Sequence, residues 1–292
     1  MSPTGSSLPR RMLGRQLRAL RENCGITMDF ARETIGVGKQ TLWRMETGQP
    51  IRMNPAFVEK LCTIYGASEQ TTSHMLGLAA ETGNTGWWHA LDARTADQCT
   101  LYLGLESTAT RVVSFQTTLL PGLFQTDEYR RALIWADQPR MPGAEVERHI
   151  ELFDQQRALL DARRTLTVDA TIDESALRRP VGGPAVMARQ LTHLAKCAER
   201  ENISIRIIPL TAAAHTGLRV GAFILLEFPP RPTPHLTDPP VVFVRGFTGN
   251  LYLEKADEVH RYRRAYTDIE RSALDKARSR TLIRRIAAEY AP

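Results

Sequence analysis

The sequence predicts an α + (α+β) fold, with a five-helix domain over residues 1–81 and a larger mixed α+β domain over residues 87–292. Three observations lead to this prediction. Apolar side chains recur at helical spacing through the first 80 residues. A turn-rich and charge-poor stretch, ETGNTG at residues 81–86, follows them. Beyond it, helical and strand-like patterns alternate, and 292 residues suffice for two domains.

The composition limits the class of protein. Hydrophobic residues make up 42% of the chain and charged residues 24%, as in ordinary soluble proteins. No run of 18 apolar residues occurs, and the N-terminus lacks the apolar segment of a secretory signal, so we expect a cytoplasmic protein without a membrane partner. The four cysteines are scattered without a CxxC pair, so we expect neither a zinc site nor disulfides. We also expect no cofactor.

Positive charge is concentrated near the N-terminus. Residues 9–52 contain nine Lys and Arg against four Asp and Glu, an excess of +5 out of +6 for the whole chain. Such a domain suits a polyanion, although a solvated basic surface would give the same asymmetry. Residues 1–9 are small and polar, and we expect them to form a mobile arm. Arg10 and Arg11 follow this arm and either contact phosphate from it or have no role in binding.

The two central helical patterns meet at a tight turn. Thr27 is a suitable cap for a helix over residues 27–35, and Gly36 can adopt the positive φ that ends it. We expect one face of this helix to be buried, through Phe30, Ala31 and Ile35. The next helix is predicted over residues 39–46, with Leu42 and Met45 on its buried side.

Three further helices would complete the domain. The first is predicted over residues 13–24, with Leu13, Leu17 and Leu20 on one face. The fourth would be capped by Asn54, followed by Pro55 at its first position, and the fifth covers residues 68–80.

The outer side of the helix at residues 39–46 is polar and cationic. It carries Lys39, Gln40, Thr41 and Arg44. These side-chain types reach base edges and phosphates when a helix enters the major groove of DNA. A generic helical hairpin with a solvated outer face is the alternative interpretation.

The first 80 residues resemble the Xre (Cro and lambda-repressor-like) helix-turn-helix family. The matching residues are Leu17-Arg18, Gly25-Ile26-Thr27, Ile35-Gly36, Leu42, Arg44-Met45-Glu46 and Gly48. The resemblance implies base contacts through the second helix of the pair and phosphate contacts by Thr27, Arg52 and Asn54. Met28 and Arg32 depart from the family, which often has a phosphate-contacting Gln and a small Ala at these positions.

The second domain mixes both kinds of element. We expect helices at residues 96–110, 127–136, 144–162, 184–200 and 255–290. Strands are expected at residues 112–119, 166–172, 203–208, 220–228, 241–244 and 251–253. The segment PPRPTPHLTDPP at residues 229–240 is too rich in proline for a central strand and is predicted to be an exposed loop.

This second domain resembles the large C-terminal domain of unknown function behind Xre domains in actinobacterial regulators of toxin–antitoxin-like systems. The matching residues include Trp87-Trp88, Leu105-Glu106, Leu120-Pro121-Gly122-Leu123-Phe124, Asp173-Glu174, Leu177-Arg178-Arg179, Leu251-Tyr252-Leu253-Glu254 and Leu282-Ile283. The resemblance implies a sensor or partner-binding module and no reaction. Small partner proteins are encoded beside such regulators.

The densest polar cluster of this domain lies just before Val181-Gly182-Gly183. Glu174, Arg178 and Arg179 are candidates for gripping an acidic ligand or a partner carboxylate. The alternative is a salt-bridged helix cap. No recognised catalytic motif is present, and no close pair of histidines has metal-ligand spacing, so we expect neither an enzyme nor a metal site.

Together these patterns predict a sequence-specific, DNA-binding transcriptional regulator. We expect a homodimer on double-stranded operator DNA, because so small a domain alone seldom binds well enough. Its C-terminal domain would respond to a small-molecule effector or a protein partner. The alternative is an antitoxin-like interaction protein that binds a small neighbour-encoded protein and regulates its own promoter.

Overall fold

The computed structural model describes residues 7–49, 51–82, 97–162, 166–230, 237–247 and 249–291. The chain divides into two compact units, Met1–Thr95 and Ala96–Pro292. Several expectations lie outside the described residues: the first six residues of the arm, residues 83–86 of the boundary, Trp87 and Trp88, and residues 231–236 of the proline-rich loop.

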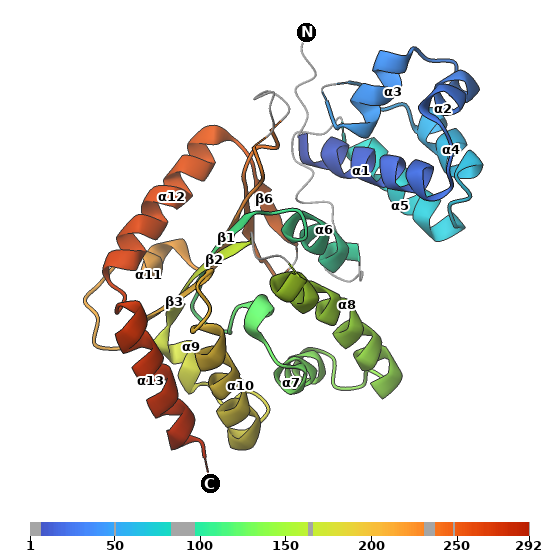
Figure 1. Ribbon diagram of the computed structural model, residues 1–292. Coiled ribbons are helices and arrows are strands. Elements are labelled where there is room, and N and C mark those ends of the chain that lie inside the picture. The colour runs from blue at the N-terminus through green and yellow to red at the C-terminus, as the bar shows by residue number, and fades with distance from the viewer. Residues whose placement is uncertain are drawn as a thin grey trace. The chain divides into compact units, whose positions relative to one another are not determined.

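The described part of the N-terminal unit consists of helices (Figure 1). They are α1 (Ser7–Asn23), α2 (Met28–Ile35), α3 (Lys39–Glu46), α4 (Pro55–Ile64) and α5 (Glu69–Glu81). Thr27, Asn54 and Ser68 cap α2, α4 and α5, each accepting a hydrogen bond from a backbone N–H of the first turn. The core is apolar and includes Leu13, Leu17, Leu42, Leu61 and Met75.

Two expectations about this unit are wrong. Helix α1 begins at Ser7, so Arg10 and Arg11 belong to its buried surface and not to an arm; Arg10 donates a hydrogen bond to the Thr82 carbonyl at 3.5 Å. Phe30 is 55% exposed, whereas Ala31 and Ile35 are buried. Phe30 and Ile35 are five residues apart, which at 3.6 residues per turn places them on different sides of α2.

The C-terminal unit is built on a mixed, six-stranded sheet with the order β3-β2-β1-β4-β5-β6. Strands β1, β2 and β3 are parallel, and β4, β5 and β6 continue the sheet in antiparallel pairs. The strand bounds are β1 (Arg111–Gln116), β2 (Thr167–Asp173), β3 (Ile203–Ile208), β4 (Phe223–Glu227), β5 (Val241–Val244) and β6 (Leu251–Leu253). The predicted α+β class is therefore confirmed, with β1 in the interior of the sheet.

Helices cover both faces of this sheet, and the alternation of side chains along β1 shows how. Val113 and Phe115 point to one face, where they pack in a core with Tyr266 and Ile269 of α12 (Ala256–Arg271). On the other face, Tyr102 of α6 (Asp97–Glu106) packs against Phe243, with ring centroids 4.6 Å apart. Figure 1 shows α12 on one side of the sheet and α6 and α8 on the other.

The parallel strands are joined by helical crossovers. The connections contain the 3-10 helix η2 (Gly122–Phe124), α7 (Asp127–Asp137), α8 (Gly143–Ala162), α9 (Glu174–Arg178), α10 (Pro184–Cys197) and, after β3, the short α11 (Gly217–Val220). The single helix expected at residues 255–290 is instead two, α12 and α13 (Lys276–Glu289). The break follows from Asp275, whose side chain accepts from the Arg278 N–H and starts a new helix.

Candidate nucleic-acid interface

The turn between α2 and α3 follows from local chemistry. The Phe30 N–H donates to Thr27 Oγ1 at 3.2 Å at the start of α2. Gly36 ends the helix with a φ of 71°, a left-handed conformation that costs glycine little. Only three residues separate Ile35 from Lys39, the first residue of α3, so the two helices are held in a fixed, short hairpin.

The inner side of α3 is fixed by packing and by one ion pair. Leu42 and Met45 are fully buried, as predicted. Glu46 is also buried, and its carboxylate accepts hydrogen bonds from Arg21 of α1: Nε to Oε1 at 2.6 Å and Nη2 to Oε2 at 2.8 Å. Because the guanidinium and carboxylate meet through two parallel bonds, α3 has a defined orientation on α1.

The outer side of α3 carries the predicted base-reading residues. Lys39, Gln40 and Arg44 are exposed, and Thr41 is half-buried. Trp43, which the sequence reasoning missed, is half-exposed and lies one turn after Lys39 and Gln40, on the same side of the helix. An aromatic ring at this position offers an apolar contact for thymine methyl groups. The four-residue spacing between Lys39 and Trp43 places both on one side of a helix, and this spacing could have identified Trp43 from the sequence.

The predicted phosphate contacts lie near helix starts. Arg52 is exposed in the loop before α4. Asn54 Oδ1 caps that helix by accepting from the Ala56 N–H at 3.0 Å. In both caps the side-chain oxygen accepts the hydrogen bond, so the donors of Thr27 and Asn54 are not used by capping. The hydroxyl hydrogen of Thr27 and the side-chain N–H groups of Asn54 are donors of the kind that bind phosphate oxygens.

The two departures from the Xre pattern have different surroundings. Met28, the first residue of α2, is half-buried. Arg32 donates from Nε to Asp29 Oδ1 at 2.8 Å and from Nη2 to Glu33 Oε1 at 3.0 Å. Arg32 is thus engaged by two carboxylates on its own helix, and its charge is compensated there.

The polar cluster of the C-terminal unit is tied into the fold. Asp173 caps α9 by accepting from the Ser175 N–H at 2.9 Å. The buried carboxylate of Glu174 accepts from Arg178 Nε at 2.7 Å and from the Leu210 N–H at 2.9 Å. Arg178 also donates to Glu289 of α13 at 2.9 Å. These bonds match the salt-bridged cap considered as the alternative, and no described contact joins Arg179 to them.

A second buried polar group lies elsewhere in this unit. Glu106, at the end of α6, is buried and accepts a hydrogen bond from the Tyr102 hydroxyl. Burial raises the pKa of Glu106 to about 7, against the lowering effects of Tyr102 and the nearby Arg130. Arg130 is itself buried, 3.7 Å above the Phe153 ring, and burial lowers its pKa to about 10. Glu106 belonged to the matched pattern but was not predicted as a site.

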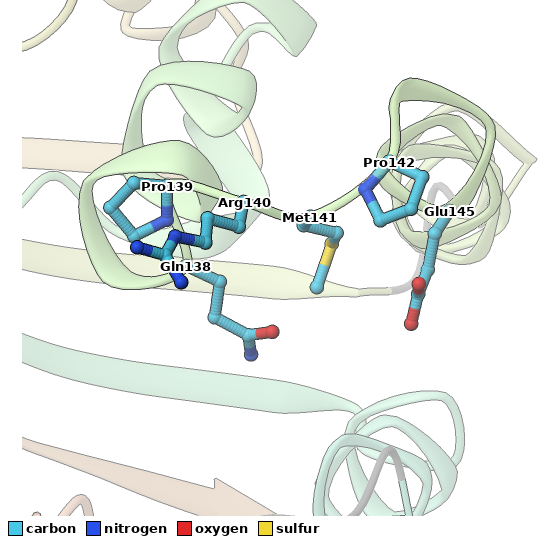
Figure 2. A pocket seen from close by; sticks show the side chains of 6 residues that line it. All are labelled: Gln138, Pro139, Arg140, Met141, Pro142 and Glu145. Carbon is cyan, nitrogen blue, oxygen red and sulfur yellow. The ribbon is translucent and has the colours of Figure 1, made fainter.

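A surface cavity of about 430 Å³ lies at the connection between α7 and α8 (Figure 2). Its lining comes from that connection and the start of α8: Gln138, Pro139, Arg140, Met141, Pro142 and Glu145. It contains none of the candidate ligand residues. Among the described residues, no three His, Cys, Asp or Glu side chains are grouped so that they could hold a metal ion.

Comparison with known proteins agrees with this division of the chain. Residues 12–75 match a helix-turn-helix domain, so the protein is a regulator of the helix-turn-helix DNA-binding class. Residues 99–285 match the domain of unknown function DUF5753, and the chain belongs to that family. No curated protein and no solved structure matches it. No helix in the described part of the chain is long and apolar enough to cross a membrane.

Proposed function

We propose that this protein is a sequence-specific transcriptional regulator of the Xre type that binds operator DNA as a dimer. One observation carries the proposal: α3 is anchored on its inner side by Leu42, Met45 and the ion pair of Glu46, while Lys39, Gln40 and Arg44 remain exposed. A rigid helix with a polar, cationic outer side is what major-groove recognition requires. Trp43 would add an apolar contact on the same side.

The remaining roles follow from this placement. Lys39, Gln40, Thr41 and Arg44 would read bases, and Thr27, Arg52 and Asn54 would hold phosphates. Residues 1–81 would form the DNA-binding domain and residues 87–292 an α+β sensor or partner-binding domain. Within the latter domain, Glu174, Arg178 and Arg179 remain the proposed ligand or partner contacts. Because both carboxylate oxygens of Glu174 already accept hydrogen bonds, a ligand would have to bind to the arginines.

The test is fluorescence anisotropy with two duplexes of equal length: the DNA upstream of the protein's own gene and a scrambled version. We expect tighter binding to the native sequence and a steep loss of affinity with salt, about 0.9 in log K per log salt for each phosphate neutralised. Equal binding to both duplexes would remove the claim of sequence specificity. A flat salt profile would argue against DNA as the partner.

A second candidate function, an antitoxin-like interaction protein, is favoured by a groove between α10 and α13. The groove has a volume of about 490 Å³ and small lining residues, among them Ala188, Thr192, Ala287, Ala288 and Ala291. Lys196, Glu199 and Arg284 also line it, with Arg284 donating to Glu199 at 2.5 Å, and α13 as a whole carries five Lys and Arg against one Glu. This charge would repel a second copy of α13 and suits an acidic helix of a partner protein.

The second function has its own test. A small neighbour-encoded protein should co-purify at fixed stoichiometry, and Ala288→Arg, which fills the groove, should abolish the complex. Ala277→Arg, at the exposed start of the same helix, is the matched control and should not. Persistence of the complex in Ala288→Arg would show that the groove is not its binding site.

A further inference from the structure

An acidic side chain lies beside the first residue of the recognition helix. Asp29 is in the first turn of α2, and its side chain is 58% exposed. Its Oδ1 accepts from Arg32 Nε at 2.8 Å, and its Oδ2 lies 3.8 Å from the Nζ of Lys39. An acid here is unexpected, because a carboxylate close to a DNA-binding surface is repelled by phosphates.

The surroundings of Asp29 keep it ionised. The hydrogen bond from Arg32 and then the charge of Lys39 lower the pKa of Asp29 below its ordinary value. Arg32 is shared with Glu33, so Asp29, Glu33, Arg32 and Lys39 together carry no net charge. The pair of Asp29 with Lys39 is exposed and therefore weak, which means that a better partner for Lys39 can replace it.

We propose that Asp29 is a positioning residue for Lys39 and, through it, a determinant of DNA-sequence specificity. This inference rests on the proposed function. Asp29 holds the ammonium group of Lys39 beside α2 and away from the nearest phosphates. On a non-cognate duplex, the loss of this pair goes uncompensated. On the cognate duplex, an acceptor such as guanine O6 or N7 takes the place of Asp29. Specificity then arises from a penalty against the wrong sequences as well as from attraction to the right one.

The experiment compares Asp29→Asn with the wild-type chain, using the duplex that the wild type selects from a random library and a scrambled duplex. We expect the variant to bind the scrambled duplex more tightly and the preference for the selected duplex to fall about fivefold or more, the lower end of what one base contact provides. The salt dependence of scrambled-duplex binding should steepen by about 0.9, because Lys39 gains a phosphate.

Two further variants separate positioning from a general effect of charge. Glu69→Gln makes the same charge change on α5, which packs on α1 and α4, and should leave the preference unchanged. In a Lys39→Ala background, Asp29→Asn should no longer alter the preference, since Asp29 acts through Lys39. Circular dichroism would check that each variant is folded.

The outcomes are distinct. A wild-type chain without any preference overturns the proposed function and this inference together. A wild-type preference that Asp29→Asn leaves unchanged overturns the inference alone. Weaker binding of Asp29→Asn to both duplexes, or a full effect of that change in the Lys39→Ala background, also overturns it, because Asp29 would then act directly.

Discussion

Arg21 and Glu46, 25 residues apart in sequence, form a buried ion pair with both oxygens of the carboxylate bonded. The side chains are 11% and 2% exposed, so both charges are largely removed from water; Arg21 also donates to the Ile26 carbonyl at 3.3 Å and lies 3.7 Å from the exposed Glu22 carboxylate. The pair joins α1 to the end of α3, which is the helix proposed to read DNA. Stability of the domain and orientation of its recognition helix therefore depend on the same contact.

Removal of one member should be costly. Glu46→Ala leaves the Arg21 charge buried without its carboxylate, and we expect a loss of about 3–5 kcal/mol in the free energy of unfolding. Urea denaturation of the full chain, followed by circular dichroism, would measure it. Glu22→Gln, which removes an exposed acid that pairs with Arg18 and lies 3.7 Å from Arg21 Nη2, should cost less than about 1 kcal/mol. Similar losses in the two variants would contradict the structural role of the pair.

Arg44 should matter for binding and little for folding, because its side chain is exposed. If it makes a bidentate base contact, Arg44→Ala will cost about 1–3 kcal/mol of affinity at the specific site. Anisotropy titrations at one fixed salt concentration would show the difference. Unchanged affinity for the specific duplex would remove Arg44 from the base-reading set.

The proposed division of labour predicts how a fragment behaves. Residues 87–292 should fold alone, because the sheet and the helices packed on it lie within the unit Ala96–Pro292. The fragment should show no affinity for either duplex. Circular dichroism and anisotropy would measure both properties, and tight DNA binding by the fragment would overturn the assignment of DNA recognition to the N-terminal domain.

Glu106 predicts a pH dependence of stability. Its pKa of about 7 in the folded chain exceeds its ordinary value of 4.5, so the folded state binds more protons than the unfolded state between these values. The contribution is fully present below pH 4.5 and is lost as pH rises through about 7. Glu106→Gln should therefore reduce the fall in Tm between about pH 5 and pH 8.

The control for that measurement is Glu151→Gln, which changes an exposed acid on α8 and should leave the pH dependence as in the wild type. An equal fall in Tm in the wild type and in Glu106→Gln would show that Glu106 titrates at its ordinary value.

Gly48 predicts a steric effect beyond backbone strain. Its φ is +68°, and an added Cβ would lie 2.5 Å from the Cα of Arg11. Gly25 has a similar φ of +70° with nothing within 4 Å. Gly25→Ala should cost about 1–2 kcal/mol for the left-handed conformation alone, and Gly48→Ala distinctly more. Thermal unfolding of both variants would compare them, and equal losses would mean that α1 yields at Arg11.

Sequence patterns predicted the features that depend on interactions between residues close together in the chain. The buried positions Leu42 and Met45 and the caps Thr27 and Asn54 depend on spacing and turn chemistry within a few residues, and all four are as predicted. The class of fold followed from the same patterns. The base-reading and phosphate-binding roles remain predictions, because no contact within the chain tests them.

Other features depend on pairs that sequence spacing does not specify. Neither the bond of Arg21 with Glu46 nor the approach of Asp29 to Lys39 follows from a helical period, since each joins two elements packed in three dimensions. The same holds for Glu174, whose partner Leu210 follows β3. Phe30 was misplaced because the buried stripe of an eight-residue helix is narrow.

The position of β1 inside the sheet has a consequence for synthesis on the ribosome. Arg111 of β1 pairs with Thr167 on one side and with Glu227 on the other, so this strand emerges long before either neighbour. The helices α1–α5, which pack on one another and precede β1 in the chain, can fold meanwhile. A message interrupted before β4 would thus yield a folded helix-turn-helix domain attached to an unfinished sheet. Because so small a domain alone seldom binds DNA well enough, such a product should not displace the proposed dimer, and premature termination in this gene should only reduce the amount of functional protein.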